Sequence, residues 1–205
     1  MDFFDKKAQL WDSDPIHWER SEAIAKKLIQ TLPLTPDMKA MEYGAGTGIL
    51  SFLLSDQFAE ITLMDSSLEM VKLAQEKIQK NESTNLSALL FDLEKEDYQE
   101  KDFNCIFTQM VMHHVHDLES VFKRFNTSLK PNGYLAIADL YIEDGSFHGE
   151  GFDGHNGFDP AELKQMLGKV GFTEINYEPC FIVKRTKEDK IREYPVFLLT
   201  AHKVQ

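Results

Sequence analysis

The chain has 205 residues, 42% of them hydrophobic and 27% charged, which is typical of a folded globular protein rather than a disordered segment. Its formal net charge is −12, so its surface repels phosphate groups on average, which argues against a protein that binds nucleic acid. No apolar run approaches the roughly 20 residues of a membrane span, and residues 1–10 lack the apolar segment of a signal peptide, so we expect a soluble, cytoplasmic protein with no membrane partner.

Only two cysteines occur, Cys105 and Cys180, and each lies in an apolar run. We expect both to be buried free thiols in a reducing compartment. No cluster of cysteines and histidines has the spacing of a zinc site, so the sequence predicts no metal centre. The sequence leaves the oligomeric state open between a monomer and a homodimer.

The first predicted element is a helix at Trp18–Leu32, where apolar residues recur at helical spacing and Pro33 follows the end. It belongs to an N-terminal lead, residues 1–36, that we expect to be part of the same domain as residues 37–205. The lead also carries aromatic side chains that either close over a bound ligand or fasten the helix to the rest of the domain. These aromatic residues are Phe3, Phe4, Trp11 and Trp18.

Strands and helices then alternate through most of the chain. Short apolar segments predict strands at Ala40–Tyr43, Glu60–Met64, Leu86–Phe91, Phe103–Gln109 and Tyr134–Leu140. Segments with helical periodicity predict helices at Ile49–Phe58, Ser67–Lys80, Leu118–Leu129 and Pro160–Val170. Asp117 and Asp159 are the expected N-caps of the last two helices, and Pro131–Gly133 is expected to form a turn.

The end of the chain breaks this alternation. Thr173–Val183 and Tyr194–Lys203 both have the pattern of strands, with no helix between them. The basic group Lys184, Arg185 and Lys187 is interpreted as a solvated turn before the last strand. Repeated strand–helix units predict an α/β fold, a mostly parallel sheet with helices on both faces. The final pair predicts a hairpin, so the last strand is expected to be antiparallel.

The most informative motif is Glu42-Tyr43-Gly44-Ala45-Gly46-Thr47-Gly48, which follows a predicted strand and opens a predicted helix. Glycine allows a tight turn and lets a ligand contact the main chain. The dinucleotide fingerprint G-x-G-x-x-G does not match, because Ile49 occupies the position of its third glycine. The alternative is an ordinary glycine-rich turn between a strand and a helix.

Two acids follow the next two strands. Asp65 ends the second strand, where a carboxylate can accept hydrogen bonds from two ribose hydroxyls; alternatively it caps the following helix. Met70 packs either on an adenine ring or in the core. Asp92 and Leu93 follow the third strand, where a carboxylate and a backbone N–H can bind adenine. The carboxyl edge of an open α/β sheet is where ligands bind.

This ordered set of motifs resembles the class I S-adenosylmethionine (SAM)-dependent methyltransferases that act on small molecules. Further similarity lies in Met112-His113-His114-Val115-His116-Asp117 and in Leu129-Lys130-Pro131-Asn132-Gly133, where Asn132 replaces a usual glycine, and extends over roughly residues 38–203. Asn tolerates the positive φ that such a position requires. The resemblance implies a Rossmann-like sheet of seven strands, with the last one antiparallel. It also implies methyl transfer from SAM, with S-adenosylhomocysteine as product.

The resemblance further implies that Glu42 orients the glycine loop and that Thr108 and Gln109 lie near the methionine part of SAM and the acceptor. The expected cofactor-binding residues are Glu42, Gly44, Ala45, Gly46, Asp65, Ser66, Met70, Asp92, Leu93, Thr108 and Gln109.

Methyl transfer needs a base only if the acceptor loses a proton during attack. The candidate catalytic residues are therefore chosen only by their position in the chain, after the fourth and fifth predicted strands. They are His113, His148 and His155; a structural role is the alternative for each. His148 and His155 lie in the glycine-rich loop Gly145–Gly157, which we expect to cover the acceptor and to be mobile without it. The alternative is a mobile surface loop without function.

Other functions remain open from the sequence. The cofactor motif reports binding and not turnover, so a non-catalytic SAM-binding sensor or scaffold is one alternative. A methyltransferase acting on protein or RNA is another, although the net charge and the lack of an added recognition domain disfavour it. A nicotinamide-dependent oxidoreductase would require the other glycine spacing.

Overall fold

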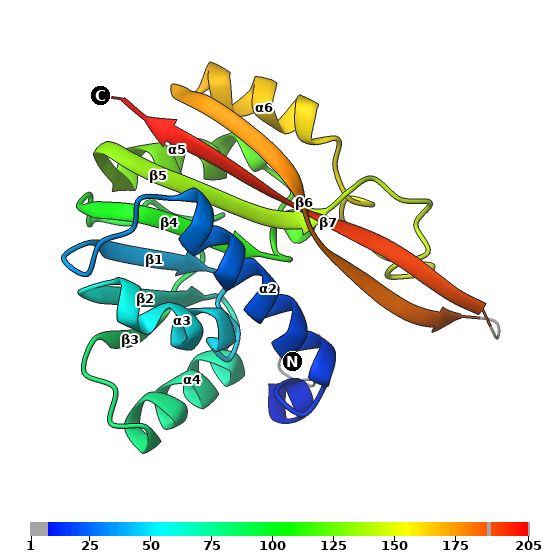
Figure 1. Ribbon diagram of the computed structural model, residues 1–205, viewed down its shortest axis with the longest axis horizontal. Coiled ribbons are helices and arrows are strands. Elements are labelled where there is room, and N and C mark those ends of the chain that lie inside the picture. Colours follow the sequence, from blue (N-terminus) through cyan, green and yellow to red (C-terminus); the bar gives the residue numbers. More distant parts are fainter. Residues whose placement is uncertain (1–7, 188–189, 205) are drawn as a thin grey trace.

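The protein is described by a computed structural model that covers residues 8–187 and 190–204. Seven strands form one sheet in the order β3-β2-β1-β4-β5-β7-β6 (Figure 1). The strands are β1 (Lys39–Tyr43), β2 (Glu60–Asp65), β3 (Leu86–Leu90), β4 (Phe103–Gln109), β5 (Leu129–Leu140), β6 (Phe172–Lys187) and β7 (Lys190–Lys203). β7 pairs antiparallel with both β5 and β6, while the pairs among β1 to β5 are parallel. The predicted Rossmann-like α/β fold is confirmed, including its antiparallel last strand.

Helices cover both faces of this sheet (Figure 1). They are α2 (Pro15–Thr31), α3 (Ile49–Leu54), α4 (Leu68–Lys80), α5 (Leu118–Ser128) and α6 (Pro160–Lys169), with short 3₁₀ turns η1 (Ser55–Gln57) and η2 (Met112–His114). One apolar layer buries Leu28 of α2 and Leu50 of α3 against the sheet, and the other buries Phe122 of α5 and Leu167 of α6. Among the described residues, no helix is long and apolar enough to cross a membrane.

Side-chain caps fix where the helices begin. The predicted caps are confirmed: Asp117 accepts a hydrogen bond from the Ser120 N–H and Asp159 from the Ala161 N–H. Helix α2 begins three residues before the predicted start, because Asp14 caps it and Pro15 occupies its first turn. The carboxyl ends of the strands are thereby joined to helix starts at one edge of the sheet.

Two predicted boundaries inside the domain are wrong. The expected turn Pro131–Gly133 lies within β5 as an irregularity of its pairing with β4, and Asn132 has a φ of +63° there. The positive φ confirms that Asn can replace the glycine that the family prefers. The expected helix Ile49–Phe58 is shorter, because α3 ends at Leu54 and the chain continues as the 3₁₀ turn η1.

The terminal hairpin is longer than predicted. β6 and β7 pair from Phe172–Lys203 out to Lys187–Lys190, and their far ends project beyond the rest of the sheet (Figure 1). The basic group that was interpreted as a solvated turn therefore lies in β6. Residues 184–186 of β6 and 190–191 of β7 are exposed, so this projecting part of the hairpin covers little core. Cys105 is buried as predicted, whereas Cys180 is only partly buried; both are free thiols.

Candidate active site

The glycine loop connects β1 to α3 and is held against the neighbouring strand. The Gly44 and Ala45 N–H groups both donate to the Met64 carbonyl of β2, at 2.8 and 3.0 Å. The Gly46 N–H donates to Asp65 Oδ2 at 2.7 Å. These bonds place the loop at the carboxyl edge of the sheet and tie it to the predicted ribose-binding acid.

Steric contacts explain why Gly44 and Gly48 have no side chain, whereas Gly46 has more space around it. Gly44 has a φ of +69°, and a Cβ there would lie 2.4 Å from Val111 Cγ2; a Cβ on Gly48 would lie 2.4 Å from Leu63 Cδ2. Gly46 also has positive φ, but its Cβ would meet only the Met70 Sδ at 3.9 Å and the Trp11 Nε1 at 4.0 Å. The backbone at Gly46 is therefore the part of the loop that is open to a ligand.

Glu42 connects the strand before the glycine loop to the helix after it. It is completely buried, and its Oε2 accepts hydrogen bonds from the Ser51 N–H at 3.1 Å and the Ser51 hydroxyl at 2.5 Å. Burial raises the pKa of Glu42 to about 8, against the lowering effect of the Ser51 hydrogen bonds. Glu42 thus fastens the end of β1 to α3, which agrees with the orienting role that was expected of it.

Asp65 is not the cap of the following helix. Ser67 caps α4 by accepting the Met70 N–H, while Asp65 Oδ1 accepts the Ser67 N–H at 2.8 Å. A carboxylate oxygen can accept more than one hydrogen bond, so Asp65 is chemically suited to hydroxyl groups beside the glycine loop. Ser66, next to it, is exposed. The ribose role of Asp65 stays a prediction that this geometry suits.

The residues predicted to hold adenine lie further along the same edge. Met70 is buried against Gly46, and Leu93 is buried in the core. Asp92 Oδ1 accepts the Glu94 N–H at 3.0 Å, and Oδ2 pairs with Lys95 at 2.7 Å. The Phe91 N–H, next to Asp92 in the chain, donates to the Asp65 carbonyl. This hydrogen bond holds the segment that carries Asp92 beside Asp65.

Thr108 and Gln109 end β4, on the other side of the glycine loop. Gln109 exchanges hydrogen bonds with the Ser21 hydroxyl at 2.9 and 3.2 Å, so it ties the strand to α2. Thr108 is 2% exposed, and its Oγ1 has no hydrogen-bond partner among the described residues. A buried hydroxyl without a partner is costly, so Thr108 is suited to a polar group of a ligand.

These residues fit the extended shape of SAM. Three features follow one another along a single edge of the sheet: the open backbone at Gly46, the carboxylate of Asp65 and the carboxylate of Asp92. The order matches a methionine moiety, a ribose and an adenine, and no phosphate-binding group is required. Individual contacts with SAM remain predictions.

The first residues of the described chain lie over the glycine loop. The Thr47 hydroxyl donates to Asp12 Oδ1 at 2.5 Å, and Lys77 pairs with Asp12 Oδ2 at 2.7 Å. Trp11 stacks on His17 at 4.1 Å between ring centroids. Trp11 thus lies against α2 and also near Gly46 of the glycine loop, so both interpretations of the N-terminal aromatics stay open; Phe3 and Phe4 lie outside the described residues.

A second polar group lies where β4 and β5 end. His113 is 1% exposed and Asp139 is fully buried; His113 Nδ1 lies 2.6 Å from Asp139 Oδ1. Asp139 Oδ2 also accepts the His113 N–H at 3.3 Å. The sequence analysis missed Asp139, because an acid at the end of an apolar strand gives no periodic signal. The pair fixes the His113 ring and leaves its Nε2 to face other groups.

Two further imidazoles surround His113. Its ring centroid lies 4.3 Å from that of His114 and 4.9 Å from that of His148, which stacks on Phe152 at 3.8 Å. The pKa of His114 is lowered to about 3, first by burial and then by the neighbouring His113 and His148. His114 is therefore neutral at physiological pH.

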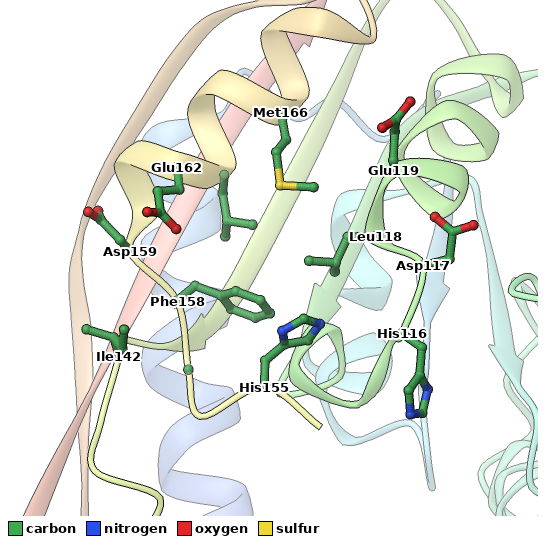
Figure 2. A pocket seen from close by; sticks show the side chains of 12 residues that line it. His116, Asp117, Leu118, Glu119, Ile142, His155, Phe158, Asp159, Glu162 and Met166 are labelled. Carbon is green, nitrogen blue, oxygen red and sulfur yellow. The ribbon is translucent and has the colours of Figure 1, made fainter. Parts of the chain in front are cut away.

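The structure separates His155 from the other two catalytic candidates. Its Nε2 lies 3.0 Å from the Val115 carbonyl oxygen, and its ring packs near Phe158 at 5.2 Å. Figure 2 shows it in a pocket of about 430 Å³ between α5 and α6, together with His116. His155 thus holds the backbone of the loop, and its alternative, structural interpretation is the one that the geometry favours.

The loop that carries these histidines is anchored at several points. The Phe147 N–H donates to Glu143 Oε2, and the Phe147 carbonyl accepts from Arg185 at 2.6 Å. The His155 N–H donates to the His113 carbonyl at 2.8 Å. Whether the loop opens without an acceptor stays a prediction; its ends are fastened to β6 and to η2.

Two arginines for which the sequence analysis predicted no role in the site, Arg20 and Arg185, lie near Asp139 and Phe147. Arg20 of α2 is 6% exposed, forms no ion pair with a described carboxylate, and its Nε has no hydrogen-bond partner among the described residues. The pKa of Arg20 is lowered to about 10, first by burial and then by the neighbouring Arg185, against the raising effects of Asp139 and Asp14. Arg185 of β6 lies 3.6 Å above the Phe147 ring. Both guanidinium groups remain charged at neutral pH.

Comparison with known proteins agrees with this geometry. The family described as "Methyltransferase domain" matches residues 17–177. An uncharacterized methyltransferase of Schizosaccharomyces pombe is 29% identical over 63% of this chain and 51% of its own length. Phosphoethanolamine N-methyltransferase 3 of Arabidopsis thaliana is 26% identical over 73% of this chain and 32% of its own length. The chain thus spans about half or less of these relatives.

Among solved structures, a Haemonchus contortus phosphoethanolamine N-methyltransferase 2 has the same fold. It superposes with a TM-score of 0.73 at 16% identity, over 92% of this chain and 53% of that one. That structure holds phosphomonomethylethanolamine and S-adenosylhomocysteine. At this identity, the similarity establishes the fold alone.

Proposed function

Because the chain belongs to the class I SAM-dependent methyltransferase family, we propose that it methylates a small molecule with an anionic group, which Arg20 binds. SAM supplies an electrophilic methyl group on a sulfonium. The acceptor atom attacks the methyl carbon, the carbon–sulfur bond breaks, and S-adenosylhomocysteine leaves. The protein contributes alignment of the two reactants and exclusion of water.

The buried guanidinium of Arg20 is the observation that carries the proposal. A buried charge is costly unless a counter-charge or several hydrogen bonds compensate it. Arg20 lacks an ion pair among the described residues, and the second cation, Arg185, is close enough to lower its pKa further. A carboxylate or phosphate on the acceptor would supply the missing counter-charge and can accept two parallel hydrogen bonds from one guanidinium.

The surroundings of Arg20 suit a small acceptor. Arg185 packs on Phe147, which contacts His148 with ring centroids 4.9 Å apart, and Asp139 acts on the Arg20 charge. These residues come from α2, β5, β6 and the loop after β5, and side chains fixed by so many elements favour one small acceptor over a flexible chain. The overall charge of −12 disfavours a nucleic-acid substrate. The plant and nematode relatives named for phosphoethanolamine suggest that compound as the first acceptor to test.

We expect Arg20→Met to raise the KM for a phosphate- or carboxylate-bearing acceptor roughly 10- to 100-fold, since a hydrogen bond to a charged group contributes about 1.5–3 kcal/mol. The SAM Kd should stay the same. Steady-state kinetics with phosphoethanolamine and with an uncharged amino alcohol would measure this effect.

Arg124→Met is the matched control for this test. Arg124 is also an arginine on a helix, but it pairs with Asp97 at 2.7 Å and bonds the Glu94 carbonyl, so its charge already has a counter-charge. Arg124→Met should leave the KM for the acceptor and the Kd for SAM unchanged. The proposal fails if folded Arg20→Met binds charged acceptors as well as the unchanged protein does, or loses the uncharged acceptor to the same extent.

A further inference from the structure

We propose that His113, His114 and His148 form a binding site for one divalent transition-metal ion of the zinc class. Each of the three residues offers a ring nitrogen, and these nitrogens all lie within 4.8 Å of one another. The sequence analysis predicted no metal, because the three histidines have no zinc-type spacing. They meet only because the loop after β5 returns His148 to η2.

The spacing of the three nitrogens suits a metal after a small adjustment. Zinc–nitrogen bonds of about 2.0–2.1 Å in a tetrahedral site place the nitrogens about 3.3–3.4 Å apart. His113 is buried and fixed, whereas His114 and His148 are partly buried. His148 lies in the loop between β5 and α6, so it can approach by the remaining distance. The immobile part of the site is therefore the sheet edge, and the adjustable part is the loop.

Asp139 gives His113 the arrangement that metal-bound histidines usually have. A metal-binding imidazole commonly donates its other N–H to a carboxylate, which fixes the tautomer and increases the basicity of the ligating nitrogen. His113 Nδ1 lies 2.6 Å from Asp139 Oδ1, so Nε2 is the nitrogen left for the metal. The Asp139 carboxylate also accepts the N–H groups of His113 and Leu140, which hold it in place.

Three imidazoles leave one tetrahedral position open. Sites of this composition take a water molecule or a substrate atom in that position, unlike closed structural zinc sites with four protein ligands. The cluster lies at the ends of β4 and β5, on the same sheet edge as the glycine loop. Val111, two residues before His113, is the side chain that a Cβ on Gly44 would strike. The inference rests on these side chains and holds whether or not the acceptor is anionic.

Binding of Zn²⁺ and Co²⁺ to the metal-free full-length chain, without SAM or acceptor, tests the site. We expect one equivalent of Zn²⁺ by calorimetry, and visible absorption bands of tetrahedral Co²⁺ that Zn²⁺ displaces. His148→Phe should weaken binding at least 100-fold, because it removes both ring nitrogens yet keeps a flat ring to stack on Phe152. Asp139→Asn should weaken it about 10- to 100-fold, as expected for the loss of an outer carboxylate.

His155→Ala is the control, because it removes an imidazole from the same loop without touching the three-histidine cluster. It should retain the full stoichiometry and the Co²⁺ spectrum. Circular dichroism and thermal melting would establish that each variant is folded. The proposal is overturned if the unchanged chain binds no stoichiometric metal, or if folded His148→Phe binds it as tightly as the unchanged chain.

Discussion

Asp65→Ala is expected to weaken SAM binding by at least 10- to 100-fold while leaving the protein folded. The variant would lose the hydrogen bonds that we propose the Asp65 carboxylate accepts from the ribose hydroxyls, each worth about 1.5–3 kcal/mol when a charged group takes part. It would also release the Gly46 N–H, which Asp65 accepts at 2.7 Å, and so loosen the loop that meets the cofactor. Titration calorimetry with SAM and with S-adenosylhomocysteine measures the loss.

Asp159→Ala is the matched control for Asp65→Ala. Asp159 also follows a loop and accepts a backbone N–H, that of Ala161, but it caps α6. Its replacement should cost about 1 kcal/mol of stability and no SAM affinity. If folded Asp65→Ala bound SAM with unchanged affinity, the acid would have no part in cofactor binding and the assignment of this edge would be wrong.

Gly44→Ala should reduce both the stability of the protein and its affinity for the cofactor. Its φ of +69° disfavours any Cβ, and the new methyl group would lie 2.4 and 2.6 Å from the two Val111 Cγ atoms. Left-handed backbone costs about 1–2 kcal/mol and overpacking about 1–3 kcal/mol. We therefore expect chemical denaturation to show a loss of about 2–4 kcal/mol, with SAM binding weakened at least tenfold.

The double variant Gly44→Ala/Val111→Ala separates these two causes. It removes both Val111 Cγ atoms and leaves the nearest Val111 atom, Cβ, at 3.0 Å, so it should recover the steric part of the loss but not the backbone part. Gly168→Ala in α6 has open space around it and should be harmless. An equal loss in the single and double variants would show that Val111 does not restrict this position.

Much of the sheet edge was predictable because it depends on local patterns. The glycine loop, the acids at Asp65 and Asp92, and the caps Asp117 and Asp159 each stand at a strand end or a helix start that periodicity predicts. The antiparallel last strand followed from the absence of a helix before it. Such features need only a few consecutive residues to be recognised.

The acceptor side was less predictable because it depends on contacts distant in the sequence. Arg20 is an ordinary charged helix residue until the fold buries it near Arg185. Nothing in the sequence distinguishes His148 from His155 as a catalytic candidate. Only the path of their loop places His148 beside His113 and His155 beside the Val115 carbonyl. The length of the terminal hairpin was missed because its far residues are mostly polar and exposed, so no alternation of buried and exposed residues marks them as strands.

Transfer of label from methyl-labelled SAM tests the central claim most directly. The protein would be incubated with phosphoethanolamine, a panel of small carboxylates and phosphates, and separate samples of cellular protein and RNA, and the products would be separated by size and charge. We predict label in a small anionic product, together with an equal amount of S-adenosylhomocysteine. Label found only in protein or RNA, or bound SAM that is transferred to none of these acceptors, would contradict the account.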